Sequence, residues 1–229
     1  MDGPAASAPA RGQLGEGAPP LVERVIECGD LRVPLLCATA LERFVDVEAL
    51  LRDEDQPEPP YWLHLWPGAL ALARRVAGDP TVRPGLDVLE LGCGLGLPAL
   101  AAARRGARVV ASDHLRAPLS VLAGSARANR CALARVQMDW RAPALCGRFH
   151  LCLGAEIGYD PAAEPAIVAA LSACLRPDGL AWLADSVNTT RQTVLALLER
   201  SGFTVRTEQV REHEDGRPVW VRLIEARRT

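Results

Sequence analysis

A short apolar run that stops at three closely spaced glycines constrains this chain more than any other feature. Residues 88–96 read Val-Leu-Glu-Leu-Gly-Cys-Gly-Leu-Gly, and a helix-compatible segment with Pro98 near its start follows. Glycine lets the backbone turn tightly and lets a ligand lie directly on the main chain, because no Cβ intervenes. A strand, a glycine turn and a helix in this order predict a nucleotide-type site at the carboxyl end of a parallel strand.

The spacing of the glycines discriminates between cofactors. The dinucleotide fingerprint is Gly-x-Gly-x-x-Gly, whereas here Gly96 comes one position early and Leu97 occupies the fingerprint place. An acid, Glu90, precedes Gly92 by two positions. This pattern favours a cofactor without pyrophosphate whose cationic end lies near a carboxylate. It indicates S-adenosylmethionine, held by Gly92, Gly94 and Gly96 beside Glu90; the alternative is a tight turn that only packs helix against strand.

Composition and charge exclude several classes of protein. The chain has 229 residues, of which 49% are hydrophobic and 24% charged, as expected for one soluble globular domain. The net charge is −2, so we expect no nucleic-acid partner, because such domains are normally basic with a clustered patch. All of the positive charge is arginine; the sequence contains no lysine. No run of about 18 apolar residues occurs, so we expect no membrane span.

The seven cysteines point to a compartment. They are scattered, without a Cys-x-x-Cys pair or a nearby pair of histidines, so we expect no metal site. An odd, unclustered set is typical of a reducing cytosol, where a buried thiol acts as a small apolar group. We therefore expect a cytoplasmic protein.

Three parts of the chain differ in character. Residues 1–20 are rich in Pro, Ala and Gly and predict a disordered tail. Residues 21–60 predict an N-terminal arm, with two strands around a Gly-Asp turn, a weak helix and an acidic, proline-rich break. Residues 61–229 predict the main domain. Within the arm, the expected strands are 22–28 and 31–36, the helix is 38–52 and the break is 53–60.

Strand and helix patterns alternate through the main domain. This alternation predicts an α/β, Rossmann-like, doubly wound and mostly parallel sheet of seven strands. The last two strands have only a short loop at 212–218 between them, so we expect an antiparallel C-terminal hairpin at or near the sheet edge. The expected strands are 87–91, 108–112, 134–138, 150–154, 180–184, 203–210 and 219–226. The expected helices are 69–76, 98–105, 118–129, 164–175 and 189–201, with Gly202 as a C-cap.

Acidic residues follow two of the expected strands. Asp113 ends the second strand, where a carboxylate is placed to accept hydrogen bonds from ribose hydroxyls, although aspartate is also a favoured helix N-cap. Asp139 and Trp140 follow the third strand. The carboxylate suits the adenine amino group and the Trp face suits the ring, although a large aromatic there is often only core packing.

The segment after the fourth strand carries the acceptor-side candidates. In a doubly wound sheet this end flanks the crevice at the switch point, so Ala155, Glu156 and Tyr159 are expected to face the transferred group. Glu156 suits the orientation of an amine, and Tyr159 suits packing of an alkylammonium against its ring. The alternatives are a solvated loop acid and a lid on the core. His64 lies between aromatic residues, where a general-base role is the alternative to a structural one, and such a histidine is more often structural.

These residues together resemble the seven-β-strand S-adenosylmethionine-dependent methyltransferases, and within them methyltransferase family 16, the protein-lysine methyltransferase-like group. The likeness covers roughly residues 60–229 and part of the arm before them. Its motifs are the glycine turn, the segment Leu-Trp-Pro-Gly-Ala at 65–69 and Glu-Ile-Gly-Tyr at 156–159, which fits the family's Asp/Glu-x-x-Tyr/Phe signature. The resemblance implies that Glu156 and Tyr159 face the methyl acceptor. The cofactor contacts that it implies are Trp66, Gly92, Gly94, Asp113, Trp140 and Ala155.

The expected activity is methyl transfer to a lysine side chain of a protein, catalysed by a monomer. Two alternatives stay open: a small-molecule N- or O-methyltransferase, and a cofactor-binding protein without catalysis. The short arm has no long inserted lid, which favours a protein acceptor. Fold alone decides none of these, because this architecture hosts many chemistries.

Overall fold

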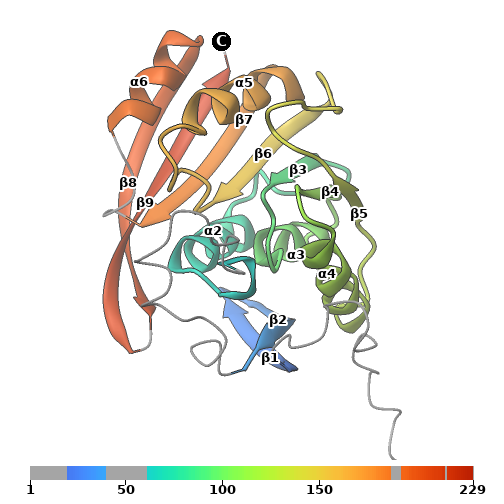
Figure 1. Cartoon of the computed structure of the whole chain (residues 1–229). Coiled ribbons are helices and arrows are strands. Elements are labelled where there is room, and N and C mark those ends of the chain that lie inside the picture. The colour runs from blue at the N-terminus through green and yellow to red at the C-terminus, as the bar shows by residue number, and fades with distance from the viewer. Residues whose placement is uncertain (1–19, 40–60, 187–191, 215, 229) are drawn as a thin grey trace, which may run out of the picture.

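A seven-stranded sheet forms the centre of the molecule (Figure 1). The computed structural model describes residues 20–39, 61–186, 192–214 and 216–228. Residues 1–19 of the expected tail and residues 40–60 of the expected arm lie outside the described residues. The sheet strands are β3 (Asp87–Leu91), β4 (Arg108–Asp113), β5 (Ala134–Gln137), β6 (Phe149–Ala155), β7 (Leu175–Ser186), β8 (Phe203–Glu214) and β9 (Arg217–Arg228). A separate two-stranded sheet pairs β1 (Leu21–Cys28) with β2 (Leu31–Ala38).

The strand order confirms the predicted fold class. The order is β5-β4-β3-β6-β7-β9-β8, and the pairs from β5 to β7 are all parallel. β9 runs antiparallel to both β7 and β8, one place in from the edge. β3 lies in the middle and buries Val88, Leu89, Glu90 and Leu91, as expected for a strand covered on both faces. The switch between the halves of the sheet therefore falls beside β3, at the end that leads into the glycine turn.

The expected loop at 212–218 is wrong. β8 runs on to Glu214 and β9 begins at Arg217, with these two residues paired. Most of β8 is exposed because it is the edge strand, so its polar sequence resembles a loop. Gly216, at φ +77°, supplies the left-handed conformation that a tight hairpin needs. The C-terminal hairpin is thus longer, and its turn shorter, than the sequence suggests.

Helices cover both faces of the sheet (Figure 1). One core packs the sheet against the first three helices and the β1–β2 hairpin, and the other packs it against the last two helices. The hairpin forms an outer layer, where the Leu36 backbone N–H donates to Ser125 Oγ at 3.0 Å. The helices are α2 (Pro67–Gly78), α3 (Leu97–Arg104), α4 (Arg116–Ala128), α5 (Glu164–Cys174) and α6 (Gln192–Arg200), and a short 3-10 turn, η3, spans Tyr61–Leu63.

Candidate functional site

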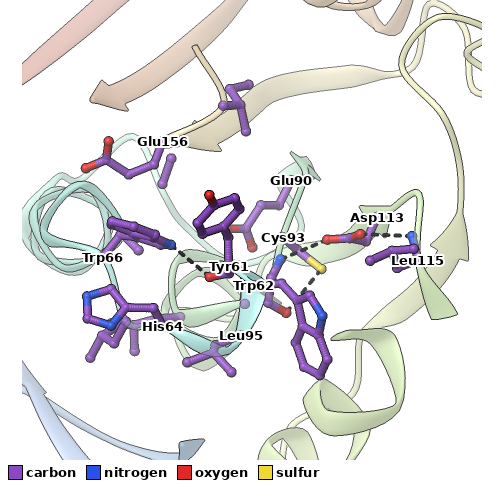
Figure 2. A pocket seen from close by; sticks show the side chains of 18 of the residues that line it. Tyr61, Trp62, His64, Trp66, Glu90, Cys93, Leu95, Asp113, Leu115 and Glu156 are labelled. Carbon is purple, nitrogen blue, oxygen red and sulfur yellow. Dashed lines mark hydrogen bonds between the residues drawn. The ribbon is translucent and has the colours of Figure 1, made fainter. Parts of the chain in front are cut away.

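A cavity of about 500 Å³ opens at the carboxyl ends of β3, β4 and β6 (Figure 2). Its position is the one that open α/β sheets use for ligands. Ten of the eleven residues predicted from the sequence line it, and Asp139 does not. The ten are Trp66, Glu90, Gly92, Gly94, Gly96, Asp113, Trp140, Ala155, Glu156 and Tyr159.

The glycine turn needs glycine for its backbone as well as for its space. Gly92, Gly94 and Gly96 have φ of +59°, +50° and +74°, a region that other residues adopt only with strain. A Cβ on Gly92 would lie 2.9 Å from Ile157 Cγ2 and 3.1 Å from Trp140 Cζ3. Main chain therefore forms this wall of the cavity, and no side chain can be added at Gly92 without moving its neighbours.

Glu90 is fully buried beneath the glycine turn. Its Oε2 accepts a hydrogen bond from the Ala99 backbone N–H at 2.9 Å, in the first turn of α3. Gly96, at the N-cap, supplies no side-chain cap, and Pro98 has no N–H, so the strand carboxyl replaces the missing cap. Burial raises the pKa of Glu90 to about 8, and the nearby charge of Asp113 adds to this rise. The acid read from the sequence as a cofactor neighbour also holds the start of α3.

Asp113 joins the glycine turn to the next βα connection. Its Oδ2 accepts from the Gly94 N–H at 3.1 Å and its Oδ1 from the Leu115 N–H at 3.0 Å (Figure 2). Burial raises its pKa, while the two N–H donors oppose that rise. The side chain is 6% exposed yet lines the cavity, so it presents a fixed carboxylate edge there.

Glu156 lies at the opposite end of the cavity from Asp113 (Figure 2). Its φ is +51°, an uncommon conformation for a residue with a side chain. Its carboxylate accepts three hydrogen bonds: from the Gly68 N–H at 3.0 Å, from the Ser186 N–H at 3.0 Å and from Ser186 Oγ at 2.8 Å. Glu156 thus connects the start of α2 with the end of β7.

Aromatic rings gather at the Glu156 end. The ring centroid of Tyr61 lies 6.3 Å from that of Trp66 and 6.4 Å from that of Tyr159. Trp66 Nε1 donates to the Tyr61 carbonyl at 2.9 Å (Figure 2). Tyr61 and Tyr159 are 42% and 48% exposed, so these rings form an open aromatic mouth. His64 packs edge-on against Trp66 at 4.5 Å, and its Nε2 pairs with Glu214 at 3.0 Å, which ties the β8 tip to this mouth.

Asp139 and Trp140 separate in the structure. The Trp140 ring lies against Gly92 and lines the cavity. The Asp139 carboxylate instead accepts hydrogen bonds from the Arg141 guanidinium, at 2.6 Å for the shortest, and this pairing lowers the pKa of Asp139 to about 2. Asp139 is therefore not part of the cavity lining, because its carboxylate pairs with Arg141 instead.

Sequence reasoning missed two lining residues beside Asp113. Leu115 is 41% exposed at the cavity, and His114 lines it as well. Their position directly after the acid that ends β4 is the only signal that could have identified them. Trp62 was not missed: the sequence places it with Tyr61 and Tyr159 in an aromatic rim, it lines the cavity, and its backbone comes within 3.4 Å of a Cβ built on Gly94.

The described residues also bear on metal binding and on membrane spanning. They contain no group of three or more His, Cys, Asp or Glu side chains placed to hold a metal ion. Among the described helices, none has the length and apolar character needed to cross a membrane.

Sequence comparison finds protein methyltransferases. No protein-family model matches the chain. It is 44% identical over 64 residues to the electron transfer flavoprotein beta subunit lysine methyltransferase of Danio rerio, covering 28% of this chain and 24% of the relative. With the Xenopus laevis protein of the same name it is 38% identical over 106 residues, 44% of this chain and 42% of the relative. A histone-arginine methyltransferase of Rattus norvegicus is 41% identical over 58 residues, 25% of this chain and 26% of the relative. The matches thus span less than half of each relative.

Solved structures share the fold at low identity. Magnesium protoporphyrin IX methyltransferase from Synechocystis, with bound S-adenosylmethionine, has a TM-score of 0.59 at 18% identity and covers 70% of this chain and 78% of its own. The cyclase SpnF has a TM-score of 0.58 at 15% identity and covers 69% and 80%. The chain thus shares its fold with a solved S-adenosylmethionine-bound methyltransferase, and its partial sequence relatives are protein methyltransferases, in agreement with the resemblance.

Proposed function

We propose that this protein is an S-adenosylmethionine-dependent methyltransferase that acts on a lysine side chain of another protein. The observation that carries the proposal is the elongated cavity, with a bare glycine wall and a fixed carboxylate at one end and an aromatic mouth at the other. The names of the sequence relatives support a protein acceptor. The matches are partial, so both activity and acceptor are proposals for this chain.

The residues present fit the cofactor. The glycine wall leaves main chain exposed to a ligand, and a Cβ at Gly92 would meet the Trp140 ring. We assign Asp113 to the ribose hydroxyls and Trp140 to the adenine ring. We assign Trp66 to the end of the cofactor that lies away from the adenine. When bound, the cofactor supplies an electrophilic methyl group, so the protein need only align the acceptor with it.

The aromatic mouth suits an amine that must lose its proton. An ammonium has no lone pair, and burial among apolar rings lowers the pKa of an amine because it disfavours the charged form. Tyr61 and Tyr159 are exposed and lie close to each other, and they flank the entrance. We therefore assign Tyr159 to contact the acceptor chain.

The direct test is methyl transfer to proteins of the native host. The purified chain is incubated with radiolabelled S-adenosylmethionine and host lysate, and labelled bands are analysed by mass spectrometry. A methylated lysine on a discrete protein is the expected result. Because the chain contains no lysine, self-labelling cannot produce this signal. Label on arginine or on small molecules alone contradicts the lysine assignment, and no transfer with retained cofactor binding indicates a non-catalytic binder.

One substitution tests the cofactor end. We expect Asp113→Ala to weaken S-adenosylhomocysteine binding by about tenfold to a hundredfold, as loss of hydrogen bonds to a charged group does. The measurement is isothermal titration calorimetry, with Asp30→Ala as a control because that carboxylate pairs with Arg105 on the surface. Unchanged affinity in Asp113→Ala contradicts the ribose assignment.

We also propose that the protein is a cytoplasmic monomer. All seven cysteines are free thiols, and five of them are buried, which suits a reducing compartment. Subcellular fractionation tests the location, and light scattering coupled to size-exclusion chromatography tests the monomer.

A further inference from the structure

The start of α2 has an unusual cap. Trp66 occupies the N-cap position without a side-chain hydrogen bond, and Pro67 has no N–H to satisfy. The first free backbone donor of the helix is therefore the N–H of Gly68. This N–H donates to Glu156 Oε1 at 3.0 Å, and the accepting residue lies 88 positions later in the chain. A negative charge at this point also interacts favourably with the helix dipole.

The contact between α2 and β7 at this point is close. A Cβ on Gly68 would lie 2.6 Å from the Ala184 carbonyl oxygen and 2.7 Å from Glu156 Oε1. The remaining donors to Glu156 come from Ser186, at the end of β7. One carboxylate thus holds together the ends of β6 and β7 and the beginning of α2, which we call the Glu156 clasp.

The part of the Glu156 clasp on α2 directly follows a residue of the aromatic mouth in the sequence. Trp66 directly precedes α2, and its indole N–H holds the Tyr61 carbonyl. The Trp66 ring is also in edge contact with His64. A shift of the first turn of α2 therefore moves Trp66, and Trp66 moves the mouth.

We infer that Glu156 is a positioning residue, which sets Trp66 and the aromatic mouth by anchoring the N-terminus of α2, rather than the group that takes a proton from the acceptor. The inference rests on the proposed function for its consequence, because positioning matters only if a methyl group is transferred there. The geometry supports it, since three hydrogen bonds already occupy most of the roughly four acceptor positions of a carboxylate.

The positioning role is first tested without any ligand. Indole N–H signals are recorded by ¹⁵N NMR, and Trp66→Phe identifies the Trp66 signal. We expect Glu156→Ala and Gly68→Ala to move this signal in the same way, because one removes the acceptor and the other pushes the helix off it. Gly78→Ala is the matched control: it lies in the last turn of the same helix, and a Cβ there meets nothing within 4 Å.

The second test separates positioning from proton transfer. With the labelled host acceptor, and at a temperature where circular dichroism shows each variant folded, we expect Gly68→Ala and Glu156→Ala each to lower kcat by about 100-fold. The double variant should fall no further than the worse single one, because both act through one contact. Glu156→Gln keeps an oxygen for Gly68 and should retain more activity than Glu156→Ala.

Two results overturn the inference. The first is normal kcat and an unmoved Trp66 signal in Gly68→Ala while Glu156→Ala is inactive. The second is equal loss in Glu156→Gln and Glu156→Ala with a Trp66 signal at its wild-type position in both, as expected for a proton acceptor. If the wild-type protein transfers no methyl group, the proposed function fails, while the NMR comparison still decides whether the Glu156 clasp positions Trp66.

Discussion

At the scale of single residues, the carboxylates of the cavity accept hydrogen bonds from backbone N–H groups. Glu90 accepts from α3 and Asp113 from the glycine turn, so neither is a freely moving acid. The sequence identifies them correctly as residues of the cavity, because acids at strand ends are recognisable. Their partners are backbone N–H groups, which carry no sequence signal. Asp139 shows the reverse case, since its local pairing with Arg141 takes precedence over the expected position in the cavity.

Glu90 leads to a prediction about pH. Its pKa in the folded protein is about 8, above the ordinary 4.5, because it is buried. The stability that this group contributes is therefore fully present below pH 4.5 and is lost as the pH rises through 8. We expect Glu90→Gln, which keeps an oxygen for Ala99, to lose less stability than the wild type between pH 5 and 9. Urea unfolding at several pH values measures this.

The control for this prediction is Glu27→Gln, at an exposed position on β1. Asp185 changes the stability with pH in the same direction as Glu90, because burial and the charges of Glu156 and Glu164 raise the pKa of Asp185 to about 7. Some pH dependence should therefore persist in Glu90→Gln. An unchanged slope in this variant contradicts the prediction.

At the scale of elements, the parallel part of the sheet is the most predictable. β3 has the expected bounds, and the other parallel strands differ from the expected bounds at their ends. These strands are easy to locate in the sequence because buried parallel strands are nearly continuous apolar runs between helices. The β8–β9 hairpin was predicted as a pair but with the wrong turn. An edge strand faces water along most of its length, so apolar periodicity is weak where β8 continues past 210. Polarity alone cannot distinguish such a strand from a loop.

The turn from β3 into α3 leads to a second prediction. Gly96 has φ +74°, and a Cβ there would lie 2.6 Å from Leu122 Cδ1 on α4. We expect Gly96→Ala to destabilise the protein by about 2–5 kcal/mol, from backbone strain and overpacking together. Gly147→Ala isolates the strain, because Gly147 has φ +58° with nothing within 4 Å, and should cost about 1–2 kcal/mol. Equal losses in urea unfolding show that the Leu122 contact is unimportant.

At the scale of the whole molecule, the cavity unites segments from both halves of the sheet. Its lining runs from Tyr61 to Tyr159, across β3, β4 and β6. The sequence predicts which strand ends meet there, because parallel strands end at one edge. It does not predict how the mouth closes, which depends on ring contacts such as Tyr61 with Tyr159 and on the pairing of His64 with Glu214.

A ligand in such a cavity should stabilise the entire domain. We expect S-adenosylhomocysteine at 100 times its Kd to raise the free energy of unfolding by about 2.7 kcal/mol, because only the folded chain binds it. Thermal unfolding with increasing ligand measures this, with NAD as the comparison ligand, since Leu97 occupies the third-glycine place of the dinucleotide fingerprint. Stabilisation by NAD alone contradicts the proposed cofactor.

The distance along the chain between Gly68 and Glu156 has a consequence for synthesis. Ribosomes make proteins from the N-terminus, so the first turn of α2 leaves the ribosome long before the residue that caps it. The mouth of the cavity cannot take its final form until β6 and β7 have joined the sheet. We expect chains that end before Ser186 to lack a competent site, so cofactor binding reports that β6 and β7 have joined the sheet.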